Sequence, residues 1–203
     1  GDTGSAAIEA FKNNNLANII ILHPEGKVSD FQRKQMTTVD AGNIYNIAVD
    51  GNFDDCQALV KKLLVDKDFN IKHNLASINS INWGRVLAQV VYYFYSAFKV
   101  MKGNENKLVN FSVPTGNFGD AYAGYVAKKM GLPIDKIIIA TNSNDILSNF
   151  FKNGLYKMSK VIPTISPSMD IQLASNFERL LYETLDHDPS LVREYMKTLS
   201  NTG

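Results

Sequence analysis

The sequence predicts an α/β fold in which parallel strands are flanked by helices. Short runs rich in β-branched and apolar residues, at 18–22 and 43–49, alternate with segments of helical periodicity. A third run, at 107–113, is followed directly by another helical pattern at 121–130. Strands and helices that alternate at this spacing are typical of βαβ units and a parallel sheet, whose ligands bind at the carboxyl ends of the strands.

The first 75 residues contain two strand–helix pairs after an initial helix. A turn at 1–4 precedes a helix at about 5–14, which Thr3 or Ser5 can cap. The strand at 18–22 is expected to be buried on both faces, and His23-Pro24 to end it. The other predicted elements are a helix at 30–39 capped by Ser29, a strand at 43–49, a helix at 53–65 capped by Asn52 or Asp54, and an irregular connection at 66–77.

The second part of the chain begins with its longest predicted helix, at 79–101. This helix is apolar nearly all round, so it is expected to lie in a core, with Asn79 or Ser80 as its cap. The remaining predicted elements are strands at 107–113 and 136–141, helices at 121–130, 145–153, 176–186 and 189–199, and an irregular stretch at 162–170 that is rich in proline and serine.

Composition argues against several classes of protein. The formal net charge is +1, so there is no electrostatic case for a nucleic-acid or membrane partner. The longest apolar stretch, 86–98, is too short to span a bilayer. One cysteine, Cys56, excludes a disulfide framework within the chain, and the three histidines are too widely separated in sequence for a zinc site. We therefore expect no metal, and a cytoplasmic location that fits the low cysteine content.

Residues 115–120 are predicted to cradle an anion. Gly116 and Gly119 allow a tight turn with exposed amides, and the following helix start adds the positive end of its dipole. The turn lacks the lysine of a P-loop and the three-glycine spacing of the dinucleotide fingerprint. The alternative is a tight strand-to-helix turn without a ligand. The residues of the predicted cradle are Thr115, Gly116, Asn117, Phe118, Gly119 and Asp120.

The segment 79–85 is an unusually polar start for a buried helix. Polar groups carried into a core need partners. A bound anion or polar ligand can supply them, and so can a structural network of caps; the sequence leaves both readings open. The same choice arises at 1–5, between a carboxylate site and a plain capped turn.

Together these motifs resemble threonine synthase, specifically the longer fungal and bacterial type. The resemblance runs essentially end to end, which makes it far more specific than one glycine-rich loop. It includes Gly1-Asp2-Thr3-Gly4 and Gly116-Asn117-Phe118-Gly119. The matching segments are 1–6, 26–29, 32–38, 51–57, 79–83, 113–120, 140–145, 167–170 and 175–179.

The resemblance implies a two-domain pyridoxal-phosphate enzyme of fold type II, the tryptophan-synthase-β-like fold. Residues 1–75 would form a smaller mobile α/β domain on the substrate side, and 76–203 part of the cofactor-binding domain. Members of the family convert O-phosphohomoserine and water to threonine and phosphate. The implied cofactor-binding residues are Thr115, Gly116, Asn117, Phe118, Gly119, Asp120 and Asp2. The implied substrate-binding residues are Thr3, Gly4, Ser5, Asn79, Ser80, Asn82 and Arg85.

The substrate phosphate needs a cation, and Arg85 is the first candidate because a guanidinium forks onto phosphate oxygens. Arg33 and Lys27 are weaker candidates for the same charge.

The chain departs from the family pattern in one respect. In the family, the lysine that bonds the cofactor precedes the Gly-Asp-Thr-Gly turn, at which this sequence begins. The C-terminal segment that meets the pyridine nitrogen has no counterpart either. We therefore expect an internal piece of the enzyme, without a catalytic residue of its own and inactive alone. The alternative function is a non-catalytic phosphate- or nucleotide-binding α/β module. The oligomeric state stays open.

Overall fold

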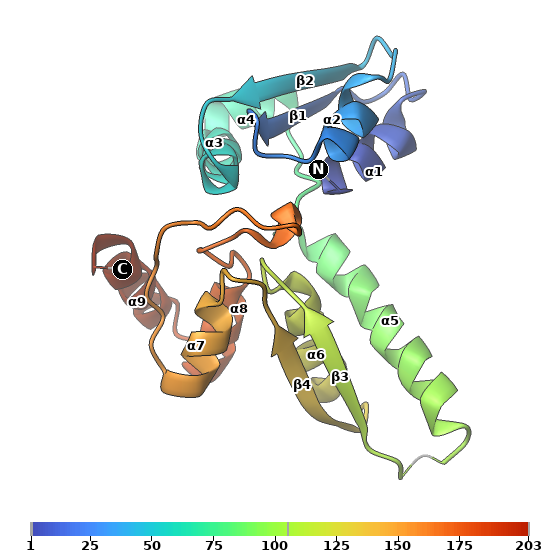
Figure 1. Cartoon of the computed structure of the whole chain (residues 1–203), viewed down its shortest axis with the longest axis vertical. Helices are drawn as coiled ribbons and strands as arrows, with labels where there is room; N and C mark the ends of the chain where they lie inside the picture. Colours follow the sequence, from blue (N-terminus) through green and yellow to red (C-terminus); the bar gives the residue numbers. More distant parts are fainter. Residues whose placement is uncertain (1, 105, 203) are drawn as a thin grey trace. The chain divides into compact units, whose positions relative to one another are not determined.

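The computed structural model describes residues 2–104 and 106–202, and it divides into two compact units (Figure 1). The first unit comprises Gly1–Asn79 and Pro163–Asp170; the second comprises Ser80–Ile162 and Ile171–Gly203. The boundary thus falls between Asn79 and Ser80, and a short segment from late in the chain belongs to the first unit. Sequence patterning predicts a boundary near 75 and gives no sign of that returning segment.

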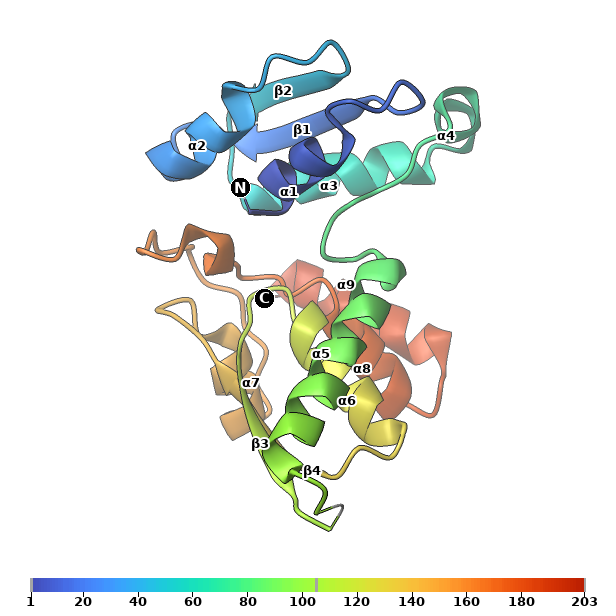
Figure 2. The same cartoon turned by 90° about the vertical axis from the view of Figure 1, so that its right-hand side faces the viewer.

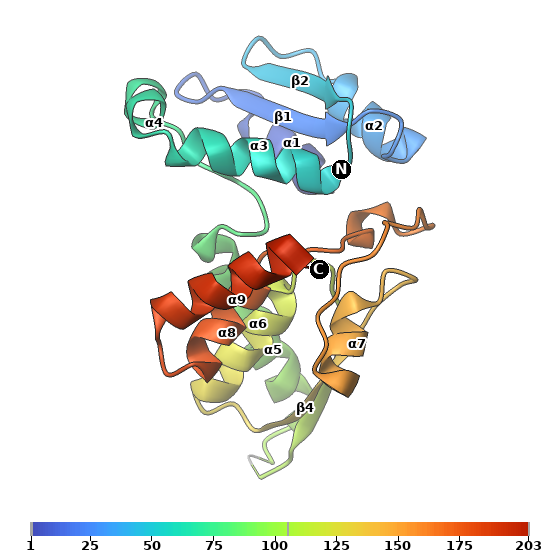
Figure 3. The same cartoon turned by 90° about the vertical axis from the view of Figure 1, so that its left-hand side faces the viewer.

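The first unit contains a two-stranded parallel sheet. Strand β1 (Ile19–Pro24) pairs with β2 (Ile44–Val49) in a register that runs from Ile19 opposite Ile44 to Pro24 opposite Val49. Helices α1 (Asp2–Phe11) and α3 (Phe53–Val65) pack against β1, and Figures 2 and 3 show both on the same face of the sheet. Helix α2 (Asp30–Thr37) packs against α1, and α4 (Lys67–His73) against α3.

Local capping chemistry explains where these helices begin. Ser29 and Gln32 form a reciprocal capping box at α2, and Asn52 and Asp55 form another at α3. Asp66 accepts a hydrogen bond from the Phe69 amide, so the connection predicted as irregular contains helix α4.

Three further expectations for the first unit are corrected. Helix α1 already includes Asp2, so the predicted caps Thr3 and Ser5 lie inside the helix, where the Ser5 hydroxyl donates to the Asp2 carbonyl. Strand β1 continues through Pro24, since proline at a strand end removes no needed ladder bond. Ile20 of β1 is 58% exposed, so this strand is not buried on both faces.

The second unit contains a second parallel pair of strands. Strand β3 (Val109–Pro114) pairs with β4 (Ile134–Ala140), and the register shifts between Val109 and Phe111. Helices α5 (Trp83–Met101) and α6 (Gly119–Lys129) pack together beside the strands, and α7 (Ile146–Asn153) packs on β4. Helix α8 (Phe177–Thr184) contacts α6, and α9 (Pro189–Thr202) lies beside α8 (Figure 3).

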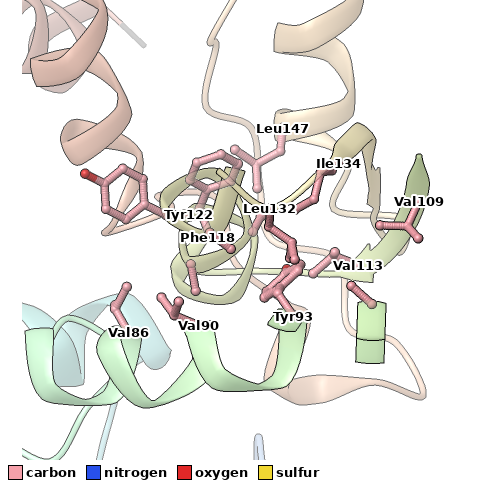
Figure 4. Close-up of a cluster of buried hydrophobic side chains, with 14 of the residues drawn as sticks. Val86, Val90, Tyr93, Val109, Val113, Phe118, Tyr122, Leu132, Ile134 and Leu147 are labelled. Carbon is pink, nitrogen blue, oxygen red and sulfur yellow. The ribbon is translucent and has the colours of Figure 1, made fainter. Parts of the chain in front are cut away.

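The core of this unit lies between α5, α6 and the strands. In Figure 4 the side chains of Val86, Val90 and Tyr93 project from α5 toward α6. Phe118, at the start of α6, and Leu147, in α7, belong to the same cluster. This packing fixes the helix that follows the predicted anion cradle.

Helix α5 is buried along one stripe only. Val86, Val90, Tyr93, Ala97 and Met101 are buried, at the three- and four-residue spacing of one helix face. The expectation that α5 is buried all round is therefore wrong: Leu87, Val91, Tyr95 and Phe98 are exposed, and Phe94 is only partly buried. Within the described residues, no helix is long and apolar enough to cross a membrane.

Candidate functional site

The Thr115 side chain forms hydrogen bonds within the loop between β3 and α6. The Thr115 side chain is 3% exposed; its hydroxyl donates to Asp120 Oδ1 at 2.5 Å and accepts the Phe118 amide at 3.1 Å. Phe118 has φ of +63°, the left-handed conformation that turns the chain into α6. Thus one of the amides expected to face a ligand, that of Phe118, is used inside the loop.

Four amides of the cradle stay available, whereas the Thr115 amide donates to the Ala140 carbonyl at 3.0 Å. Among the described residues, none accepts a hydrogen bond from the backbone amides of Gly116, Asn117, Gly119 or Asp120. Gly119 is the first residue of α6, so its amide lies at the positive end of the helix dipole. The Asp120 carboxylate accepts from the Ala121 amide and from Thr115, so it holds the loop together. The backbone here can donate several hydrogen bonds to an anion.

Asn176 and Arg179 join this loop to the start of α5. The Asn176 side chain is fully buried and donates to the carbonyls of Ser80 at 2.8 Å and Asn117 at 3.1 Å. The Asn176 amide also donates to the Asn117 carbonyl, at 3.0 Å. Arg179 donates from Nε to Asn176 Oδ1 and from its terminal nitrogen to the Ile81 carbonyl. Both residues lie in the segment 175–179 that resembles the family, but the sequence predicts no site role for either.

The polar segment before α5 is thus held by a cap network, one of the two readings left open. Asn82, not Asn79 or Ser80, is the N-cap of α5, and it accepts the Gly84 amide at 2.8 Å. The Arg179 guanidinium lies over the Trp83 ring, 5.4 Å from its centroid. Partial burial lowers the pKa of Arg85, which remains a cation at neutral pH. A ligand for Asn79, Ser80, Asn82 or Arg85 stays a prediction.

In the first unit, the Asp2 carboxylate is held by two hydrogen bonds. Ser168 donates its hydroxyl to Oδ2 at 2.6 Å, and Gln32 donates Nε2 to Oδ1 at 2.8 Å. These bonds, with that from Ser168 the larger influence, hold the pKa of Asp2 below its ordinary value. Its predicted approach to the cofactor is untested, as are the substrate contacts predicted for Thr3, Gly4 and Ser5.

Gly4 lies in a closely packed part of the same helix. A Cβ at this position would lie 2.9 Å from Met36 Sδ and 3.2 Å from Ile21 Cγ2. Glycine here lets α1 approach α2 and β1 closely.

The lowered pKa of Asp2 predicts a pH-dependent contribution to stability. Its carboxylate stabilises the fold fully above the ordinary pKa of 3.8, and this contribution is lost as pH falls through the lowered value. We expect the stability difference between wild type and Asp2→Asn to shrink below pH 3.8 in urea unfolding experiments. Asp40→Asn, at an exposed aspartate of the same unit, is the control. A difference that is constant across the titration would contradict this role.

The two weaker candidates for binding the substrate phosphate lie in the first unit, and each has a partner within that unit. Lys27 Nζ donates to the Gly51 carbonyl at 2.7 Å, and Arg33 pairs with Asp30 at 3.4 Å on the exposed surface. Burial raises the pKa of the Cys56 thiol, which argues against a nucleophile there. No group of three or more histidine, cysteine or acidic side chains that could hold a metal is found among the described residues.

Comparison with known proteins identifies relatives along the whole chain. No model of a known protein family matches it. It is 54% identical over 197 residues to the threonine synthase of Saccharomyces cerevisiae, covering 97% of this chain and 37% of that protein. It is 48% identical over 203 residues to the threonine synthase of Pseudomonas aeruginosa, covering 100% of this chain and 43% of that protein.

Solved structures give the same result. The PLP-bound threonine synthase of Brucella melitensis aligns with a TM-score of 0.84 and 52% identity, covering 100% of this chain and 43% of that one. The yeast threonine synthase aligns with a TM-score of 0.80 and 48% identity, covering 98% and 41%. By sequence and by fold, this chain is therefore a homologue of threonine synthases and spans about two fifths of their length.

Proposed function

We propose that this chain is part of a pyridoxal-phosphate enzyme that converts O-phosphohomoserine and water to threonine and phosphate. The observation that carries the proposal is the row of free amides at Gly116, Asn117, Gly119 and Asp120, at the carboxyl end of β3 and the start of α6. Its support from comparison is the likeness to threonine synthases, one of them with PLP bound.

The residues of the cradle fit a phosphate group. Backbone amides at a helix start bind phosphate without needing a lysine. Gly119 is also a position where a side chain has little room, since a Cβ would lie 3.1 Å from Asn176 Nδ2 and 3.3 Å from the Ser80 carbonyl. When bound, pyridoxal phosphate supplies an electron-withdrawing ring that stabilises negative charge on the substrate carbon.

The chain's own residues then bind and orient. In the proposal, the amides of the cradle hold the cofactor phosphate and Arg85 attracts the substrate phosphate. The start of α1, with Thr3, Gly4 and Ser5, holds the substrate carboxylate. The first unit, which also includes 163–170, is proposed to be the substrate-side domain, and the second unit part of the cofactor domain.

No lysine of this sequence lies in the family's cofactor-bonding motif, so the chain alone is predicted not to turn over substrate. The cytoplasmic location remains a prediction that fits the low cysteine content.

Amide chemical shifts test the proposal directly. We expect pyridoxal phosphate to shift the ¹⁵N-amide signals of Gly116, Asn117 and Gly119, with a smaller effect at Gly131 and Gly154. Pyridoxal without its phosphate is the ligand control and should leave the cradle signals in place. Shifts caused by ATP or NAD but not by pyridoxal phosphate would instead favour the nucleotide-binding alternative. No response to any phosphate ligand would overturn both functions.

A further inference from the structure

The cradle and the start of α5 share one pair of partners. Asn176 donates from a single nitrogen to the carbonyls of Asn117 and Ser80, which are 59 and 96 residues away along the chain. Arg179 continues the link, bonding Asn176 Oδ1 at 3.0 Å and the Ile81 carbonyl at 2.9 Å. Figure 2 shows α5, α6 and α8, the helices that these segments adjoin, within the one unit.

The link is built to hold position. The Asn176 side chain is held in one rotamer, because it is fully buried and both its amide nitrogen and its amide oxygen form hydrogen bonds. The Arg179 guanidinium is planar, so two bonds and the stacking on Trp83 fix its orientation. A shift of the Ser80–Ile81 backbone is therefore resisted by the same groups that hold Asn117.

We propose that Asn176 and Arg179 are positioning residues that couple the anion cradle to the start of α5. Through them, an anion that orders Asn117 and Gly119 also orders Ser80 to Arg85. Arg179 acts by holding Asn176 and the Ile81 carbonyl, and it needs no contact with the anion. The ligand-dependent part of this inference rests on the proposed function, whereas the coupling itself does not.

Amide hydrogen exchange of Arg179→Met without ligand tests the coupling. Methionine keeps much of the apolar stem and removes both donors. Exchange is expected to become roughly tenfold faster at the Phe118 amide and at Gly84 to Val86 together, because a lost charge-assisted hydrogen bond costs about this factor. Faster exchange at Gly84 to Val86 with no change at Phe118 would overturn the coupling and leave Arg179 as a cap of α5 alone.

Two further variants test whether the effect comes from the fork geometry of the Arg179 guanidinium, from its charge, or from a general loss of stability. Arg193→Met removes an exposed guanidinium that, among the described residues, bonds Ser190, and exchange at the cradle should not change. Arg179→Lys keeps the charge but not the fork, so it should behave like Arg179→Met. Exchange restored by lysine would contradict the positioning role. Amides of α7 serve as an internal reference, because uniform acceleration there would show global destabilisation instead of coupling.

Binding of inorganic phosphate supplies the ligand-dependent readout. If wild type binds phosphate at Gly116 and Gly119, Arg179→Met should bind it roughly tenfold more weakly, in line with the exchange effect. Unchanged affinity in the variant overturns the proposed ordering by the anion. If wild type binds no phosphate, the proposed function fails, and the exchange experiment still decides the coupling.

Discussion

Replacing Asn176 with alanine is expected to lower the free energy of unfolding by about 3 kcal/mol or more. The substitution leaves the Ser80 carbonyl without its donor, takes one donor from the Asn117 carbonyl and removes the acceptor of Arg179 Nε. Each buried polar group left unsatisfied costs roughly 1–3 kcal/mol, and the cavity left by the amide adds to the loss. The Asn117 carbonyl keeps the bond from the backbone amide of residue 176, which limits the damage there.

Chemical denaturation of the variant measures this loss. Asn153→Ala is the matched control, because Asn153 is the exposed last residue of α7 and the change should cost less than about 0.5 kcal/mol. A loss of under about 1 kcal/mol in Asn176→Ala would mean that water replaces the amide in this network, and the coupling inferred for Arg179 would lose its basis.

Much of the fold could be predicted because its signals are local. Ser29 with Gln32, and Asn52 with Asp55, define helix starts within four residues of sequence. The strands at 18–22 and 43–49 are apolar runs between turn residues, and their parallel pairing follows from the helix between them. Helix α4, in the connection predicted as irregular, also has a local signal, because Asp66 is a favourable N-cap.

Part of the candidate site was out of reach because its contacts join distant segments. The turn at 115–120 could be predicted from its glycines, and most of its amides are free as expected. That Thr115 occupies the Phe118 amide depends on a side-chain rotamer that spacing does not reveal. The roles of Asn176 and Arg179 depend on carbonyls that lie far away in sequence, and a helix start at 176 offers no sign of them. Ser168 meets Asp2 across 166 positions of sequence for the same reason.

Gly124→Ala is expected to destabilise the protein by about 2 kcal/mol, although helix propensity alone predicts the opposite sign. Alanine inside a helix is favoured over glycine by roughly 1 kcal/mol. At Gly124, however, the new Cβ would lie 2.6 Å from Tyr93 Cε1 and 2.9 Å from its hydroxyl oxygen. The Tyr93 ring is buried between α5 and α6 and donates to the Asp120 carbonyl at 2.7 Å, so moving it costs packing and a hydrogen bond.

The comparison with a glycine in open space isolates this steric cause. Gly42 has no atom within 4 Å of a built Cβ, so Gly42→Ala should be neutral or slightly stabilising in the same unfolding experiment.

Tyr93→Phe should cost less stability in the Gly124→Ala background than in wild type, because the hydrogen bond to Asp120 is already weakened there. The displaced ring would also loosen the first turn of α6, where the cradle amides lie, so phosphate binding should weaken together with stability. A stabilised Gly124→Ala protein would show that α5 and α6 do not meet as closely as these distances require.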